Sequence, residues 1–198
     1  MMKTVQRCTW TKNDPQMCTY HDQEWGVPET DSRALWEKLM LDGFQAGLSW
    51  QTILRKREAF RKAFKNFDPV KVAAFKETQI EALMQDEKII RSRSKITATI
   101  GNARAYLQMQ EEGEDFAEWI WTMSGGKPIQ NTGKGESFAV PVSSDLSHEI
   151  SKALKKKGFK FVGPVIVYAW LQACGIINDH HPDCFRQKEC RALARDFK

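Results

Sequence analysis

The 198-residue sequence predicts an all-α fold. Apolar residues recur at helical spacing through most of the chain, and Ser, Thr or Asp stands at the start of several such stretches. No stretch alternates between apolar and polar residues as a half-buried strand would, and no internal repeat is visible. At this length we expect one large domain, or two lobes that share a core.

The N-terminal half is expected to hold a series of capped helices. Asp31 is placed to cap a helix that Gly43 is expected to end, and Ser49 is placed to cap the next helix. Further helices are expected after Asp68-Pro69, after a capping box of Thr78 with Glu81, over about 96–107 and over about 116–121.

The C-terminal half begins with a different composition. Residues 124–144 are rich in Gly, Ser, Thr and Pro and have little periodicity, which predicts a long loop. A helix over about 145–157, a tight turn over 158–163 and a helix over about 164–174 are expected to follow. The residues after Cys184 are polar and charged and are expected to fray, leaving a core of about 7–184 and a tail of 185–198.

The charge is mildly basic. Lys and Arg number 30 against 25 for Asp and Glu, which gives a net charge of +5. Three basic islands lie at 55–57, 91–95 and 155–160, and each of them could be a solvated helix face. The third lies where a helix gives way to a turn, with Gly and Phe interleaved, and this setting favours contact with phosphates.

Other features of composition bear on the compartment and on ligands. The N-terminus lacks the apolar core of a signal peptide, and no stretch approaches the length of a membrane span, so we expect a cytoplasmic protein with no membrane partner. In a reducing compartment the five cysteines point to metal ligation or buried thiols rather than disulfides. Seven tryptophans exceed the needs of a core of this size, so some are expected to face a ligand.

Cysteine and histidine near the two ends of the chain form a candidate metal site. His180 and Cys184 are close enough in sequence to converge on one ion, whereas Cys8 and His21 can converge only through the fold. Two thiolates and two imidazoles would make a closed structural zinc site. From spacing alone, three substitutes stay open as ligands: Cys18, Cys174 and His181.

The turn at 158–163 is a candidate DNA contact. Gly158 and Gly163 would let the backbone approach a phosphate, and the following helix N-terminus adds a positive dipole. Lys160 would add attraction that is independent of sequence. An ordinary corner between two helices is the alternative interpretation of the same pattern.

Several short motifs occur together in one order. They are Cys8-Thr9-Trp10, YHDQEWGVP at 20–28, QAGLSW at 45–50, Ile89-Ile90-Arg91, NARAYL at 102–107, GFKFVG at 158–163 and Asn178-Asp179-His180. In this combination the chain resembles the DNA-3-methyladenine glycosylase I family, from about residue 7 to residue 184. The resemblance implies a helix-hairpin-helix DNA glycosylase fold with a structural zinc that joins the N- and C-terminal segments through Cys8, His21, His180 and Cys184.

The resemblance also implies an activity and its site. The target nucleotide is flipped out of the duplex into an aromatic pocket that includes Tyr20, Trp50 and Asp42, and 3-methyladenine is excised by hydrolysis, which leaves an abasic site. Trp10 and Trp25 belong to the same neighbourhood, although packing would explain either of them equally well.

Leu48 is the candidate wedge into the space that a flipped base would leave. A role in core packing is the alternative for this side chain. The remaining partners implied by the resemblance are double-stranded DNA with alkylated bases and the zinc ion. We expect no organic cofactor and a monomeric protein.

Asp42 is the candidate catalytic carboxylate and also a departure from the family, which has Glu at this position. Asp is one methylene shorter, which withdraws the carboxylate by roughly 1.5 Å. A carboxylate there would accept a hydrogen bond from the amino group of the base and favour its positive charge. Asp179 is expected to serve as a cap or as a contact to the zinc site rather than as a catalytic group.

Two rival functions follow from the same residues. A non-catalytic, zinc-stapled protein that binds alkylated DNA is the main alternative, because Asp42 replaces the family Glu. A zinc hydrolase is the other, but it requires an open coordination position that four protein ligands would close. Release of free base from alkylated DNA distinguishes the enzyme from the binder.

Overall fold

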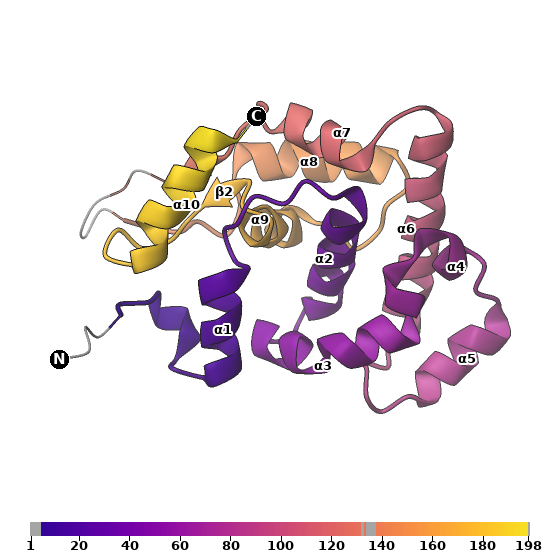
Figure 1. Ribbon diagram of the computed structural model, residues 1–198. Helices are drawn as coiled ribbons and strands as arrows, with labels where there is room; N and C mark the ends of the chain where they lie inside the picture. Colours follow the sequence, from indigo (N-terminus) through magenta and orange to yellow (C-terminus); the bar gives the residue numbers. More distant parts are fainter. Residues whose placement is uncertain (1–4, 132, 134–137, 198) are drawn as a thin grey trace.

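The computed structural model describes residues 5–131, 133 and 138–197. This part of the chain is mostly helical, as predicted, and it contains ten α-helices (Figure 1). In chain order the elements are η1 (Thr9–Thr11), α1 (Pro15–Gln23), α2 (Ser32–Gln45), α3 (Trp50–Ala63), η2 (Lys65–Phe67), α4 (Pro69–Ala73), α5 (Glu77–Gln85), α6 (Arg93–Glu111), α7 (Phe116–Met123), β1 (Ile129–Gln130), α8 (Asp145–Lys156), α9 (Pro164–Ala173), β2 (Ile177–Asn178) and α10 (Phe185–Asp196). None of these helices is long and apolar enough to cross a bilayer.

The caps predicted for α2, α3 and α4 are confirmed. Asp31 accepts a hydrogen bond from the Ala34 amide at 2.7 Å, and Ser49 accepts one from the Thr52 amide at 3.2 Å. The carboxylate of Asp68 accepts from the amide of Val70 at 3.1 Å. Each cap satisfies an amide that has no partner within the helix, which fixes where the helix begins.

Two predicted helix boundaries are wrong. α2 does not end at Gly43 but continues to Gln45, and Gly43 faces the backbone of Phe161 in the turn before α9. α5 starts at Glu77, one residue before Thr78, and Glu81 forms an ion pair with Arg93 instead of closing a capping box. At α5 a different local contact fixes the start, because the Gln79 side chain accepts a hydrogen bond from the Lys76 amide at 2.8 Å.

The prediction of no strands is also wrong in one small respect. β1 pairs in parallel with β2, with Ile129 opposite Ile177 and Gln130 opposite Asn178. β1 lies in the segment 124–144, where the other described residues form no helix or strand. Two-residue strands are too short to produce a periodic signal, so only their non-local pairing reveals them.

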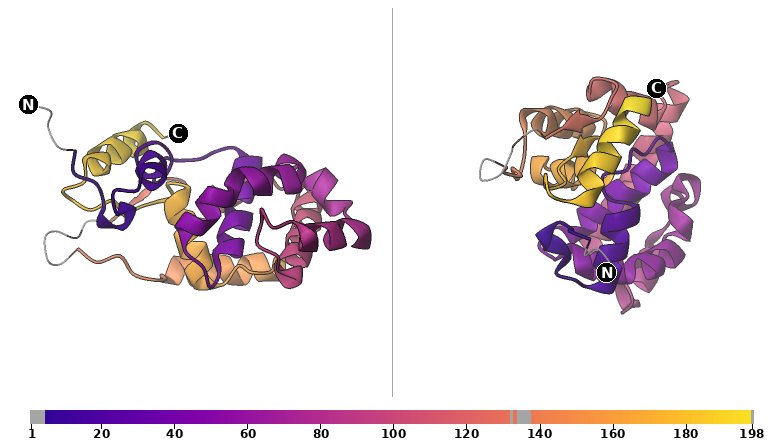
Figure 2. Two further views of the ribbon diagram at one scale, coloured as in Figure 1. Left: turned by 90° about the horizontal axis from the view of Figure 1, so that it is seen from below. Right: turned by 60° about the vertical axis from the view of Figure 1, so that its left-hand side comes forward.

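The segment after Cys184 does not fray, contrary to the prediction. It forms α10, in which Cys190 is buried, and Phe197 beyond the helix packs on Trp121 with ring centroids 4.2 Å apart. The amide of Phe185 donates to the Gln6 carbonyl at 3.1 Å, so the N-terminal segment lies beside the start of α10 (Figures 1 and 2). The low hydrophobicity of α10 concealed this docking in the sequence.

The core has a large and a small part. The large cluster includes Trp36, Phe60, Phe116 and Trp170, all with almost no exposure. The small cluster gathers Cys8, Met17, Tyr20, Trp25, Leu54, Ala173 and Cys184. The small cluster joins the N- and C-terminal segments. It includes residues of the candidate metal site and of the candidate aromatic pocket.

Gly175 holds the chain after α9 against the segment after α1. Its φ is +67°, and a Cβ there would lie 2.3 Å from the Val27 carbonyl carbon. We expect Gly175→Ala to lower the free energy of unfolding by about 3 kcal/mol, because backbone strain and steric overlap add. The measurement is urea unfolding.

Gly113 provides the matched control for this substitution. Its φ is +82°, but nothing lies within 4 Å of its hypothetical Cβ. Gly113→Ala therefore carries only the backbone cost of about 1 kcal/mol. Equal losses for the two variants would contradict the close approach at Gly175.

Candidate functional site

Four of the predicted metal ligands converge on one point. Cys8 precedes η1, His21 lies in the last turn of α1, His180 follows β2, and Cys184 caps α10. One ligand atom from each lies within 4.8 Å of all the others, and all four residues are buried. This is a site at which two thiols and two imidazoles could hold a metal ion.

The imidazole rings are held in orientations that direct a nitrogen at the sulfurs. The Nε2 atom of His21 lies 3.3 Å from the Cys184 sulfur, while its Nδ1 lies 2.8 Å from Asp22 Oδ1. His180 directs Nδ1 at both sulfurs, each at 3.6 Å, and its Nε2 lies 3.1 Å from the Trp25 carbonyl. Such partners on the far nitrogens are typical of histidines that bind metals.

The donor set fits a cation in its electrostatics as well. The hydrogen bond with Cys8, followed by those with the two histidines, lowers the pKa of the Cys184 thiol well below its usual value. The same interaction with Cys184, together with burial, raises the pKa of Cys8. A divalent cation would stabilise both side chains as thiolates, because metal binding favours the deprotonated form of each thiol.

The three alternative ligands lie outside this cluster. Cys18 is partly buried on α1, and Cys174 is buried at the end of α9. The side chain of His181 is 41% exposed and lies 3.6 Å from Asp183. The described structure therefore brings together the four residues that the family resemblance implies, and none of the substitutes.

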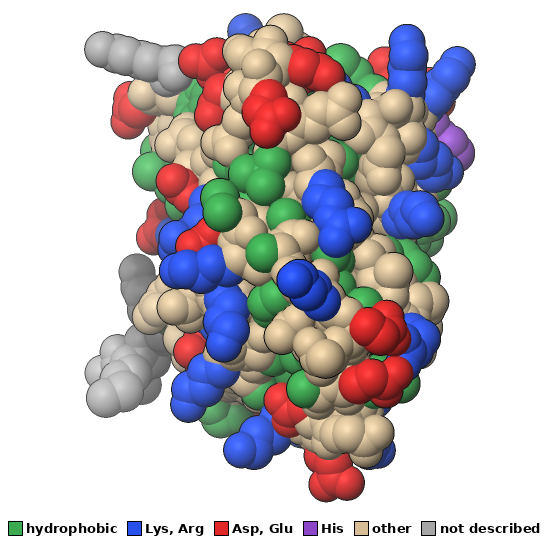
Figure 3. All heavy atoms as spheres, turned by 90° about the vertical axis from the view of Figure 1, so that its right-hand side faces the viewer, with side chains coloured by type: hydrophobic (Ala, Val, Ile, Leu, Met, Phe, Trp, Pro, Cys, Tyr) green, Lys and Arg blue, Asp and Glu red, His purple; other side chains and the backbone are tan. Residues whose placement is uncertain are grey.

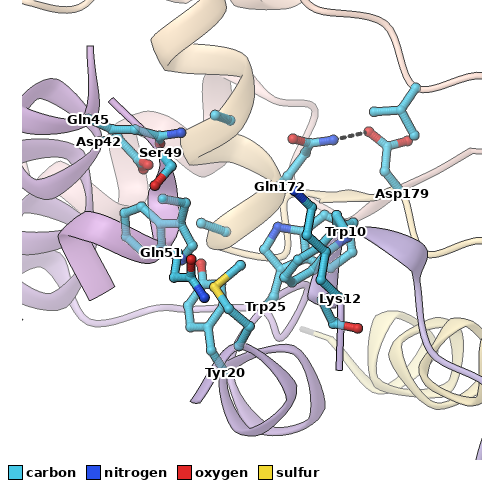
Figure 4. A pocket seen from close by; sticks show the side chains of 16 residues that line it. Trp10, Lys12, Tyr20, Trp25, Asp42, Gln45, Ser49, Gln51, Gln172 and Asp179 are labelled. Atoms are coloured by element: carbon cyan, nitrogen blue, oxygen red, sulfur yellow. Dashed lines mark hydrogen bonds between the residues drawn. The ribbon is translucent and has the colours of Figure 1, made fainter. Parts of the chain in front are cut away.

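An aromatic cavity of about 440 Å³ lies next to the cluster. Trp10, Tyr20, Trp25 and Trp50 line it, so the structure brings these four predicted pocket residues together. Figure 4 labels the first three of them. The rings of Tyr20 and Trp50 are 5.3 Å apart, and those of Trp10 and Trp25 are 5.1 Å apart at 71°. Trp10 and Trp25 therefore pack against each other and also line the cavity, so both of the roles considered for them apply.

Asp42 lines the same cavity from α2. It is only 4% exposed, and its Oδ2 has no hydrogen-bond partner in the described structure. Burial raises its pKa well above the usual value, and Lys38 offsets this only in part. A buried acid without a hydrogen-bond partner is costly for stability, and such groups are concentrated at functional sites.

Asp179 lies on the opposite wall of the cavity (Figure 4). Its carboxylate accepts hydrogen bonds from Asn131 at 2.8 Å and from Tyr168 and Gln172 at 2.7 Å each. Neither expected use of Asp179, a helix cap or a contact to the zinc site, is seen in the described structure: its partners are on α9 and after β1, and the far nitrogen of His180 lies against Trp25.

The turn between α8 and α9 is held from both sides. Asn102 of α6 accepts from the Lys160 amide at 2.8 Å and donates to its carbonyl at 3.0 Å, and the Ser151 hydroxyl donates to the Val162 carbonyl at 2.6 Å. Gly158 adopts a φ of +95°, and Gly163 is the N-cap of α9. Lys160 is exposed and forms no ion pair with any described residue.

Leu48 lies in the loop between α2 and α3 and is 41% exposed, which does not fit the core-packing alternative. The Lys95 ammonium fixes the start of this loop, because it donates to the carbonyls of Phe44 at 2.8 Å and Ala46 at 2.6 Å. Lys95 belongs to the second basic island, so part of that island has a structural use.

The first basic island is also engaged within the protein. Arg57 forms a bidentate pair with Glu24 at 2.6 and 2.9 Å, and Arg55 pairs with Asp14 at 3.0 Å. On the side of the molecule that carries α4, α5 and α6, basic and acidic side chains are interspersed (Figure 3). Of the three islands, the one at 155–160 retains exposed lysines beside a glycine turn.

Some residues of the site were not singled out from the sequence. Gln172 lines the cavity, and Asp22 fixes the His21 ring. The acid beside a histidine was a readable signal for Asp22. Gln172 carries none, since a glutamine on an apolar helix gives no indication of what it faces.

Comparison with known proteins identifies the family. Residues 10–187 match the model of the methyladenine glycosylase family. A DNA-3-methyladenine glycosylase 1 from Escherichia coli (strain K12) is 53% identical over 180 residues, which are 91% of this chain and 96% of the relative.

Solved structures agree with this relationship. A crystal structure of a 3-methyladenine DNA glycosylase I has a TM-score of 0.88 and 50% identity, covering 91% of this chain and 98% of the other. A point variant of such an enzyme, in complex with 3-methyladenine, has a TM-score of 0.87 and 37% identity, covering 91% and 97%. With a family model that spans most of its length and a relative at this identity, the chain belongs to the methyladenine glycosylase family.

Proposed function

We propose that this protein is a base-excision repair glycosylase that hydrolyses the N-glycosidic bond of 3-methyladenine in alkylated DNA. The carrying observation is the aromatic cavity, in which Tyr20 and Trp50 lie beside the buried, unpartnered Asp42. The named glycosylase relatives favour catalysis over the alternative of a protein that only binds alkylated DNA.

The cavity suits a cationic base. An adenine methylated at N3 is positively charged in DNA, and aromatic faces attract a cationic ring by roughly 0.5–2 kcal/mol. Its glycosidic bond is already weakened because the base leaves as a neutral molecule. Recognition can therefore do much of the work, and flipping costs less for a damaged base than for a normal one.

Asp42 acts on this charge. When no base is bound, burial favours its protonated form. A cationic base nearby favours the carboxylate, which then stabilises positive charge as the bond to the sugar breaks. Water completes the reaction at the sugar carbon and leaves an abasic site. Departure of a neutral base requires no covalent intermediate with a lysine, so the proposed enzyme is monofunctional.

The contacts with DNA are proposed from the exposed residues. Leu48 would enter the space left by the flipped base, while Gly158, Lys160 and Gly163 in the turn before α9 would meet phosphates as a helix-hairpin-helix. The partner is double-stranded DNA that contains alkylated bases. We further propose a monomer in which residues 1–198 form a single glycosylase domain of two helical lobes.

We propose that Zn²⁺ occupies the site formed by Cys8, His21, His180 and Cys184. Four protein ligands leave no position for a substrate, so the ion would be structural. It would tie the ends of the chain together and thereby hold Tyr20, on the same helix as His21, at the cavity. The absorption spectrum of a cobalt-substituted sample reports the number and kind of ligands.

The function is tested by incubating the purified protein with methylated DNA and identifying what is released. Free 3-methyladenine is the expected product. Tight binding without release would support the binder instead and would contradict the proposed enzyme.

Asp42→Glu is expected to raise the excision rate about tenfold, because the longer side chain closes a gap of roughly 1.5 Å to the base. The measurement is single-turnover release of 3-methyladenine, with Glu111→Asp on the surface of α6 as the control. An unchanged or lower rate would mean that the cavity is built around Asp.

A further inference from the structure

Gln172 presents a hydrogen-bond acceptor to the aromatic cavity. Its Nε2 donates to Asp179 Oδ2 at 2.7 Å. Because a carboxylate only accepts hydrogen bonds, this contact fixes which end of the amide faces Asp179. The Oε1 atom is therefore turned away, as Figure 4 shows, and no described residue donates to it.

The acceptor is held rigidly. Asp179 is 3% exposed and is itself fixed by Tyr168, one turn before Gln172 on α9. The carbonyl of Gln172 accepts from the Gly26 amide at 3.1 Å, which ties this point of α9 to the segment after α1. A lone acceptor in such a setting binds donors and disfavours other acceptors.

The third partner of Asp179 is fixed as well. Asn131 donates to Asp179 Oδ1 at 2.8 Å and to the Ala139 carbonyl at 3.1 Å, and its own oxygen accepts from the Gly133 amide at 3.1 Å. The Asn131 amide cannot turn over without losing all three contacts. Only Gln172 is free to reverse if the carboxylate is altered.

We propose that Gln172 determines specificity: its Oε1 accepts a hydrogen bond from the amino group of the flipped purine, and Asp179 is the positioning residue that directs this oxygen into the cavity. The inference rests on the proposed function. It adds Gln172 as a second acceptor for the two N–H groups of the amino group, beside the carboxylate of Asp42, whose shorter side chain is withdrawn from the base.

The test compares two free bases of one shape, 3-methyladenine and 3-methylhypoxanthine, in which oxygen replaces the amino group. Binding is followed through the fluorescence of the cavity tryptophans. The wild-type protein is expected to bind 3-methyladenine at least about tenfold more tightly, as a net hydrogen bond of ordinary strength predicts. The readout is the ratio of the two dissociation constants, since damage to the fold would weaken both ligands alike.

Asp179→Asn is expected to abolish or invert this ratio. In this variant the side-chain oxygen of the amide introduced at position 179 will accept from the fixed Asn131 amide, so the side-chain nitrogen at that position will face Gln172. The Gln172 amide then reverses to accept from that nitrogen, and it presents its own NH₂ group to the cavity as a donor. The double variant Asp179→Asn with Gln172→Glu is expected to restore the ratio, because the carboxylate introduced on α9 accepts from that nitrogen and keeps an acceptor in the cavity. Glu111→Gln, at an exposed position on α6 outside the cavity, is the control and is expected to leave the ratio unchanged.

The outcomes separate this inference from the function. A wild-type preference that persists in Asp179→Asn would overturn the inference alone. If the wild-type protein binds neither base and releases none from DNA, the proposed function fails and the inference with it. Metal content, measured for every variant, shows whether the adjacent His180 still holds its place.

Discussion

Asp42→Asn is expected to slow excision of 3-methyladenine about 100- to 1000-fold, the usual effect of removing one electrostatic group aimed at charge in a transition state. Asn has the same size but cannot become negative as the base and sugar carry positive charge. The measurement is the single-turnover rate on methylated DNA. A loss of less than about fivefold would mean that Asp42 does not act through its charge.

The same substitution is expected to stabilise the empty protein at neutral pH. Burial raises the pKa of Asp42 in the folded state above its value in the unfolded chain. Between those two pKa values the folded state binds more protons, so the free energy of unfolding falls as pH rises. Asn escapes this penalty, and its advantage should be absent near pH 4 and grow towards pH 7.

Urea unfolding at several pH values checks this stability effect. Glu111→Gln, at an exposed position on α6, is the control for loss of one negative charge. A pH-independent difference between Asp42→Asn and the wild-type protein would contradict the raised pKa. Opposite effects of one substitution on rate and on stability are the mark of a group kept for function.

Cys184→Ala is expected to cause a large loss of stability. Metal binding contributes directly to folding at closed thiolate and imidazole sites, on the order of 10 kcal/mol in small zinc domains. Here the metal would join segments that a large apolar core supports elsewhere, so we expect a loss of about 3–5 kcal/mol. Loss of bound zinc should accompany it.

Cys18→Ala is the matched control, because Cys18 lies on α1 outside the cluster. It should retain zinc and nearly all of the stability. A chelator should lower the melting temperature of the wild-type and Cys18→Ala proteins but leave that of Cys184→Ala unchanged. A wild-type protein that is insensitive to chelation and contains no metal would contradict the zinc site.

Features set by neighbouring residues could be predicted from the sequence. Asp31, Ser49 and Asp68 each cap a helix through an amide two or three residues away, so the signal is local. α10 and the pairing of β1 with β2 could not be predicted, because each depends on docking against distant parts of the chain.

The candidate site divides in the same way. Cys8, His21, His180 and Cys184, and the aromatic lining, followed from motifs that resemble one family. The orientation of Gln172 did not, because its partner Asp179 lies seven positions further on, beyond the end of α9, where helical spacing no longer applies. Hydrogen bonds of this range carry no periodicity and no spacing rule.

The central claim is that this protein hydrolyses the N-glycosidic bond of 3-methyladenine. Its most direct test is to count products in a single turnover on a duplex that contains this base. The account predicts one molecule of free 3-methyladenine and one abasic site for each turnover, with the DNA strand intact. Bound duplex without free base, or strand cleavage with an enzyme–DNA adduct trapped by borohydride, would contradict it.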